Sequence, residues 1–260
     1  MILSANEFQF FYKSNIIMTK LVYNLPKLFK SYVSETPSFS KIVTNYKSHI
    51  KGFDHMAFRN LKKDDMIDET YLQKQTDLFE FKKYNSRAVW FKFKKELDPD
   101  FKRLFVSCYK GIEEDDKLSD MDREIVKDVF NNLDKKLDHN VYQLINSKNQ
   151  YLGWTIIHRN RINHVALLVD DIKKFIDILV NDGFEFNEVN GEIIHTGLNG
   201  KLLQGSLMAD PVKYEFSDGT YLVPGSFVEF VQRIDNIDGF NNDNAIKIMH
   251  STNSIKKIDN

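Results

Sequence analysis

The chain has 260 residues, and its 36 lysines and arginines nearly balance 37 aspartates and glutamates, which gives a formal net charge of −1. This balance argues against a protein that binds mainly to nucleic-acid phosphates or to anionic lipid. Hydrophobic residues make up 42% of the chain and charged residues 28%, as in an ordinary globular protein. The single cysteine excludes an intrachain disulfide and a cysteine-rich metal site, so any metal must be held by carboxylates and some of the seven histidines.

Residues 1–20 form an aromatic N-terminal extension that lacks the charged, apolar and small-residue order of a secretory signal. We interpret it as an extension or a weak transit segment, and Met18 is a conceivable alternative start. No run reaches the roughly 18 consecutive apolar residues of a transmembrane helix. The single cysteine and the missing signal favour an intracellular, cytoplasmic protein, and organelle targeting by the extension stays open.

A first module is expected over residues 21–150. Apolar spacing predicts a helix over 25–33, and Ser34 and Pro37 then predict the cap and the first turn of a second helix. Alternating apolar and polar residues predict short strands at 52–61, 86–94 and 103–111. Residues 119–146 carry an apolar stripe that is typical of a helix.

A second module is expected over residues 151–238. It begins with a strand at 161–169, followed by a helix that Asp170 or Asp171 caps and Gly183 ends. Three pairs then predict the turns of a meander: Asn190-Gly191, Asn199-Gly200 and Asp218-Gly219. The last strand is SFVEFVQRI, and the Asn- and Asp-rich residues 239–260 are expected to form a mobile tail. This order of elements predicts an α+β fold.

Two histidines stand among apolar neighbours on predicted strands. Strand alternation predicts that Phe53 shares a face with His55, and that Ile162 shares a face with His164. In the last strand, Glu229 shares its face with two apolar residues, so burying its carboxylate is unfavourable unless a cation neutralises it.

Two histidines and one carboxylate that leave one side open form the facial triad of non-haem Fe(II) oxygenases. His55, His164 and Glu229 are therefore the candidate metal ligands. Their spacing alone does not join them, and each has an ordinary alternative, as a hydrogen-bonded strand histidine or a solvated glutamate.

Three further residues are candidates for substrate contacts. Arg59 follows His55 by four residues on the same predicted face, so its guanidinium can lean toward the metal and bind a distal carboxylate of a substrate. Its alternative is a surface salt bridge. Gln204 and Ser206 are polar residues on an otherwise apolar run, with strand-edge hydrogen bonding as their alternative.

Three segments resemble the hallmark segments of the 2-oxoadipate dioxygenase/decarboxylase (hydroxyglutarate synthase) family: DHMAFRNL, YLGWTIIH with the following RINHVALLV, and KLLQGSLMADPVKYEFSDGTYLVPGSFVEFVQR. LFKSYVSETPS and NSRAVWFKFKKELDPDFKRLFVS support the resemblance, which spans residues 25–234. The chain departs from the family pattern at Met56 and at Asn60-Leu61, and it is more similar to the short members than to the long bacterial ones.

The resemblance implies a vicinal-oxygen-chelate-like fold, in which paired β-rich modules form a half-barrel around a metal site with flanking helices. It places His55, His164 and Glu229 on the metal ligands and Arg59 on the substrate-binding arginine. It implies Fe(II), O2 as co-substrate and a small-molecule 2-oxo acid, and the balanced charge predicts no nucleic-acid or membrane partner. With 2-oxoadipate, the products would be 2-hydroxyglutarate and CO2, as in lysine breakdown; Asn60-Leu61 beside Arg59 leave the exact substrate open.

Two alternatives come from other functional classes. One is a metal-dependent isomerase or lyase of the same fold that uses zinc or manganese and no O2. The other is a non-catalytic metabolic or regulatory binding protein. The oligomeric state stays open.

Overall fold

The computed structural model describes residues 29–59, 161–216, 219–237 and 239–240, together with shorter pieces at 79–83, 88–93, 105–109, 119–121, 123–124, 154, 157–158 and 256–258. Residues 29–35 are helical and precede α3 (Pro37–Asn45), and a short 3₁₀ turn, η1 (Lys47–His49), leads into β1 (Ile50–Arg59). Three short strands follow: β2 (Phe79–Lys83), β3 (Ala88–Phe93) and β4 (Phe105–Tyr109).

The second half of the chain begins with β5 (Arg161–Val169) and α8 (Ile172–Asn181). Its remaining elements are β6 (His195–Gly197), β7 (Leu202–Ser206), β8 (Pro211–Phe216), β9 (Gly219–Pro224), β10 (Phe227–Arg233), the 3₁₀ turn η4 (Ile234–Asn236) and β11 (Lys256–Ile258).

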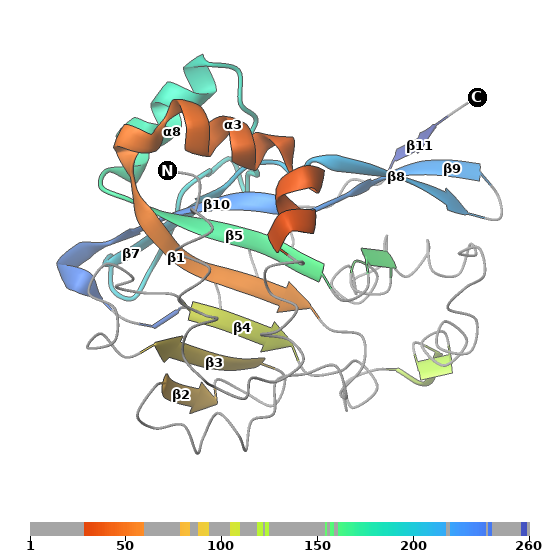
Figure 1. Ribbon diagram of the computed structural model, residues 1–260, viewed down its shortest axis with the longest axis horizontal. Helices are drawn as coiled ribbons and strands as arrows, with labels where there is room; N and C mark the ends of the chain where they lie inside the picture. Colours follow the sequence, from red (N-terminus) through yellow and green to blue (C-terminus); the bar gives the residue numbers. More distant parts are fainter. Residues whose placement is uncertain are drawn as a thin grey trace.

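Eight of these strands form one sheet in the order β2-β3-β4-β1-β5-β10-β7-β6 (Figure 1). The sheet repeats one pattern outward from its centre, where β1 and β5 pair antiparallel. On one side β4 is parallel to β1 and β3 is antiparallel to β4; on the other side β10 is parallel to β5 and β7 is antiparallel to β10. The division of the chain into modules at residues 21–150 and 151–238 stays a prediction, and so does the half-barrel shape.

Most predicted elements in the described residues are confirmed. The strand at 161–169 has the predicted bounds, the strand predicted at 52–61 overlaps β1, and those predicted at 86–94 and 103–111 contain β3 and β4. Asp171 caps α8, since its carboxylate accepts a hydrogen bond from the Lys174 N–H at 3.1 Å. The extension at 1–20 and most of the predicted helix at 119–146 lie outside the described residues.

One cap prediction is wrong. Pro37 does begin a helix, but the residue before it is Thr36, whose side chain makes no capping bond. Ser34 lies in the preceding helical segment, and its hydroxyl donates to the Ser31 carbonyl at 2.8 Å. The cap position is therefore occupied by Thr36, and the Ser34 hydroxyl bonds backward along its own helix.

Helices α3 and α8 lie on the same face of the sheet (Figure 1) and bury its apolar core. Both helices contribute buried side chains to one cluster with Val165, Val228 and Phe230 of the central strands. Gly205 in β7 permits a close approach, because a Cβ atom there would lie 2.9 Å from the Ile176 Cδ1 atom of α8. The helices therefore cover one face of the central strands β1, β5 and β10, and a site on these strands must lie on the other face.

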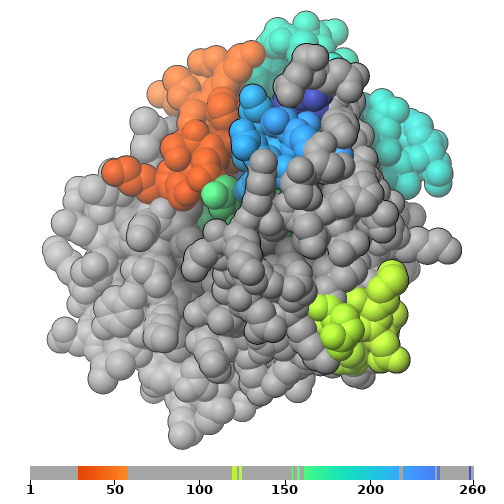
Figure 2. Space-filling view, turned by 90° about the vertical axis from the view of Figure 1, so that its right-hand side faces the viewer, coloured from red at the N-terminus to blue at the C-terminus, as the bar shows by residue number. Residues whose placement is uncertain are grey.

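A separate three-stranded sheet has the order β11-β9-β8. On the molecular face seen in Figure 2, the orange residues of the first half lie beside the light-blue chain of this part, and Ser38 at the start of α3 donates to the Asp210 carboxylate at 2.6 Å. The tail predicted from residue 239 onward contains β11, which pairs antiparallel with β9. No helix in the described part of the chain is long and apolar enough to cross a membrane.

Candidate metal centre

The three predicted ligands lie on three adjacent central strands. His55 is on β1, His164 on β5 and Glu229 on β10. In the β-ladder, Ala166 of β5 pairs with His55 on one side and with Glu229 on the other. Because Ala166 carries only a methyl group, the longer side chains on either side of it can converge above it. His164 lies two residues before Ala166 and so faces the same way.

Two β-bulges set the direction of the histidines. Between the pairs Phe53–Leu167 and His55–Ala166, β1 has one extra residue, Asp54. Between the pairs Ala57–His164 and Phe58–Ile162, β5 has one extra residue, Asn163. Each extra residue immediately precedes a histidine. A bulge reverses the alternation of faces along a strand, and it is often found beside functional sites.

The bulges correct two predictions about strand faces. Phe53 and Ile162 do not share a face with the histidines that follow them, because both pack in the helix-covered core cluster. The prediction for the last strand holds: the Phe227 ring stacks on His164 at 4.8 Å, and Val231 lies with Ala166 in a separate small apolar cluster. Alternation failed only where the strand carries an extra residue.

Each extra residue also orients its histidine. The Nδ1 atom of His55 lies 2.8 Å from the Asp54 Oδ1 atom, and the Nδ1 atom of His164 lies 3.0 Å from the Asn163 Oδ1 atom. These oxygens are acceptors, so each Nδ1 carries the proton and donates it. The Nε2 atoms then point at the centre, which is the arrangement that a metal-ligating histidine requires.

The donor atoms are spaced as one ion requires. The two Nε2 atoms are 3.1 Å apart, and the Glu229 Oε2 atom lies 3.3 Å from the Nε2 atom of His164 and 3.6 Å from that of His55. Ligand bonds of about 2.1 Å at right angles place neighbouring donor atoms about 3 Å apart. The three donor atoms can therefore bind one face of a single divalent cation. Two histidines with one carboxylate are the donor set of non-haem iron.

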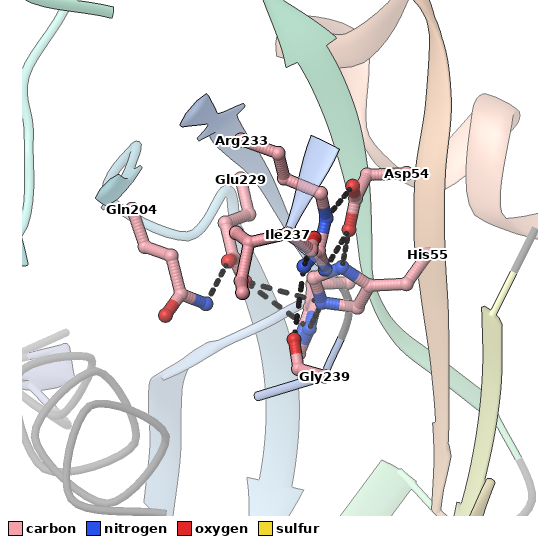
Figure 3. Close-up of polar contacts among 8 residues, drawn as sticks. Asp54, His55, Gln204, Glu229, Arg233, Ile237 and Gly239 are labelled. Carbon is pink, nitrogen blue, oxygen red and sulfur yellow. Dashed lines mark hydrogen bonds and ion pairs between the residues drawn. The ribbon is translucent and has the colours of Figure 1, made fainter. Parts of the chain in front are cut away.

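Burial and charge act in opposite directions on Glu229. Burial would raise the pKa of this carboxyl, but the two histidines and a hydrogen bond from Gln204 lower it below its ordinary value. The Gln204 Nε2 atom donates to the Oε1 atom at 2.8 Å (Figure 3). One carboxylate oxygen is thereby held by the amide, and the other, Oε2, faces the histidines. Glu229 is a carboxylate in the folded protein, ready to bind a cation.

The same balance holds on the far side of His55. Burial opposes a charge on Asp54, yet hydrogen bonds from Arg233 and His55 lower its pKa to about 2. Burial also disfavours the imidazolium form of His55, but the charges and hydrogen bonds of Glu229 and Asp54 outweigh it and raise the pKa to about 9. Without a metal, a proton on the Nε2 atom of His55 takes the place that the cation would occupy.

The predicted substrate contacts stay predictions. Arg59 is the last residue of β1, and its side chain lies outside the described residues. Gln204 bonds Glu229, and the Ser206 hydroxyl oxygen accepts a hydrogen bond from the Asn187 amide at 3.0 Å, so both have partners inside the protein. Asp54, Asn163 and Arg233 were not predicted from the sequence. The signal that was present is an acidic or amide residue directly before each histidine.

Comparisons with known proteins identify one family. The model of the family described as 2-oxoadipate dioxygenase/decarboxylase matches residues 101–237. A rice protein (Oryza sativa subsp. japonica) named 2-oxoadipate dioxygenase/decarboxylase, chloroplastic/amyloplastic, is 24% identical over 291 residues, which cover 90% of this chain and 78% of the relative.

Two solved structures have a similar fold. The hydroxyglutarate synthase from Oryza sativa, crystallised in complex with 2-oxoadipate, superposes with a TM-score of 0.70 at 23% identity and covers 88% of this chain and 90% of its own. A glyoxalase-superfamily protein from Ralstonia eutropha JMP134 superposes with a TM-score of 0.57 at 17% identity, covering 85% of each chain. The chain therefore has the mixed α/β fold of these proteins.

We expect the small side chain of Ala166 to be necessary for metal binding. In Ala166→Leu, the larger side chain would fill the space above this residue, where the three ligand side chains converge, at a cost of about 1–3 kcal/mol in stability. Titration with Co(II) should show binding lost in this variant and kept in the control Ala166→Gly, which leaves the space open. Wild-type affinity in Ala166→Leu would show that the ligands converge elsewhere.

We expect metal affinity to rise with pH. Below pH 9 the metal must displace a proton from His55, since its pKa is raised to about 9, whereas Glu229 stays ionised because its pKa is lowered. Displacing one proton makes the apparent affinity increase about tenfold per pH unit, or about 100-fold from pH 6.5 to 8.5. Competition with a chelator of known proton affinity measures this slope, and a flat profile would contradict it.

Proposed function

Because this chain belongs to the 2-oxoadipate dioxygenase/decarboxylase family, we propose that it is an Fe(II)-dependent dioxygenase that decarboxylates and hydroxylates a 2-oxo dicarboxylic acid. The first candidate substrate is 2-oxoadipate, which with O2 would give 2-hydroxyglutarate and CO2, a step of lysine breakdown. The atoms balance, since a six-carbon oxo acid and O2 become a five-carbon hydroxy acid and CO2. The observation that carries the proposal is the convergence of two imidazoles and one buried carboxylate.

His55, His164 and Glu229 would hold the metal from one side and leave the opposite side free for substrate and O2. Bound Fe(II) would supply the activation of O2 for oxidative decarboxylation of the 2-oxo acid and hydroxylation of the shorter acid. Asp54 and Asn163 keep each imidazole in the tautomer that presents Nε2, and Gln204 fixes the Glu229 carboxylate. The protein's contribution is therefore a preset arrangement of ligands that needs no separate nucleophile.

The substrate would approach past His164. The His164 side chain is 14% exposed, against 3% for His55 and 2% for Glu229, so among the ligands it lies nearest to solvent. The rice relative's crystal structure with 2-oxoadipate supports a small 2-oxo acid as the ligand. Arg59, four residues after His55, would bind the distal carboxylate through its guanidinium and so fix the substrate's orientation.

We propose a cellular location on different grounds from the activity. The plastid terms in the name of the rice relative support import into an organelle, which is the alternative to the cytoplasmic location expected from the sequence. A fluorescent fusion of the full chain, compared with one that begins at Met18, distinguishes the two.

Oxygen consumption tests the proposed activity directly. After anaerobic loading with Fe(II), the protein should consume O2 and release CO2 with at least one 2-oxo acid of a panel that includes 2-oxoadipate. His164→Ala and Glu229→Ala should lose both activities because each removes one of three ligands. His49→Gln is the matched control. The His49 ring stacks on Phe175 and is not one of the three proposed metal ligands, so this variant should keep turnover.

The outcomes separate the functional classes. Tight binding of zinc or manganese with no O2 uptake would indicate an isomerase or lyase of the same fold. Metal binding without turnover of any 2-oxo acid would favour a binding protein. Wild-type activity in Glu229→Ala would overturn the ligand assignment itself.

Arg59 is tested by comparing two substrates. In Arg59→Ala, kcat/KM for 2-oxoadipate should fall about 10- to 100-fold. This loss corresponds to the free energy of a hydrogen bond between charged groups. A 2-oxo acid of similar length that ends in a methyl group has no distal carboxylate, so wild type and variant should use it equally well. Equal losses with both acids would show that Arg59 acts on the fold rather than on the distal carboxylate.

A further inference from the structure

Arg233 uses all three guanidinium nitrogens inside the protein (Figure 3). It is the last residue of β10 and lies four residues after Glu229. Its Nε and Nη2 atoms donate to the two Asp54 carboxylate oxygens at 2.5 and 2.9 Å. Its Nη1 atom donates to the backbone carbonyls of Ile237 at 3.1 Å and Gly239 at 2.9 Å. The side chains of Arg233 and Asp54 are 1% and 0% exposed.

The Asp54 carboxylate connects this arginine to the metal centre. Its Oδ1 atom accepts from Arg233 and also from the His55 Nδ1 atom, at 2.9 and 2.8 Å. A buried carboxylate without a cationic partner is strongly unfavourable. Removing the guanidinium would therefore displace the Asp54 side chain toward water and weaken its hold on His55.

The chain after β10 folds back over His55. Asp235, Asn236 and Gly239 have positive φ angles of 54°, 56° and 96°, which turn the chain sharply. The turn brings the Phe240 ring to 4.8 Å from the His55 ring, edge to face, and the guanidinium carbon of Arg233 lies 4.8 Å from the centre of the same phenyl ring. The arginine thus holds both the acceptor behind His55 and the aromatic ring that covers it.

The two histidines are supported unequally. His55 is backed by a buried ion pair, whereas His164 is backed by the neutral amide of Asn163. Partners in a metal site that bond a ligand rather than the metal commonly change metal affinity about 10- to 100-fold when they are removed.

We propose that Arg233 is a positioning residue of the metal centre: it holds Asp54 against His55 and Phe240 over the imidazole, and so fixes His55 as a ligand and keeps water from it. The proposal rests on the proposed metal site and not on the choice of substrate. Arg233 itself would not touch metal or substrate.

Co(II) is a suitable probe, because its visible spectrum reports ligand number and geometry and its affinity can be measured by chelator competition without turnover. Arg233→Gln should weaken Co(II) binding about 10- to 100-fold and change the visible bands. Arg233→Lys keeps the charge but loses the bidentate pair, so it should recover part of the affinity. Phe240→Leu keeps the ion pair, and its loss of affinity should be smaller.

Two more variants keep the test decisive. The double variant Asp54→Asn/Arg233→Gln removes both charges of the buried ion pair, so neither charge is left without its partner. It should therefore fold even where a single variant does not, and it should still bind Co(II) weakly. If Arg233 acts through Asp54, the double variant should be little weaker than Arg233→Gln alone. Lys201→Gln is the matched control: it breaks the exposed 2.8 Å ion pair of Lys201 with Asp235 on the same returning segment and should leave Co(II) affinity within twofold.

The outcomes distinguish this proposal from the proposed function. Arg233 variants whose melting temperature falls while Co(II) affinity and spectrum match wild type would overturn the positioning role and leave the metal site standing. Wild-type protein that binds no Co(II) would overturn both. Weak binding and altered bands in the Arg233 variants, with normal binding in Lys201→Gln, would support the role even if no 2-oxo acid is turned over.

Discussion

The carboxylate of Glu229 is 2% exposed on a central strand, and its burial requires positive charge and hydrogen-bond donors around it. These requirements produce a series of alternating charges that begins and ends on β10. Glu229 faces His55 and the proposed cation, His55 bonds Asp54, and Asp54 pairs with Arg233, four residues along the strand from the start of the series. Two of the three proposed ligands, Glu229 and His55, stand in this one series, so they form an electrostatic unit with Asp54 and Arg233 rather than separate ligands.

The centre also lies where the two halves of the large sheet meet. The strand order on one side of the β1–β5 pair repeats the order on the other side. His55 comes from the first half, and His164 and Glu229 come from the second. The same pair of strands therefore joins the halves by backbone hydrogen bonds and by the side chains of the cluster. The helix-covered face supplies apolar packing, and the opposite face is left for chemistry.

Much of this arrangement could be predicted from the sequence, because the strands that carry the ligands have strong apolar patterns. Their bounds were nearly correct, and an apolar strand with one internal carboxylate indicated a cation. Pairing between β1 and β5 could not be predicted, since they are about a hundred residues apart and nothing local fixes their register. The faces of Phe53 and Ile162 were wrong because strict alternation has no place for an extra residue. Arg233 was missed because its partner lies 179 positions away, and its sequence context is that of an ordinary strand end.

The two bulges make the lengths of β1 and β5, the strands of the two histidines, a part of the site. Phe53 and Met56 both face the helices, and so do Ile162 and Val165. In a regular strand the residues of each pair would face opposite sides, so the bulge between them is what turns both to the same side. Substitution of Asp54 or Asn163 would change a hydrogen bond, but deletion of either would remove its bulge and turn every later side chain of that strand to the opposite face. A change of length in either segment would therefore separate the ligands, whereas an exchange of residues at constant length would keep them together.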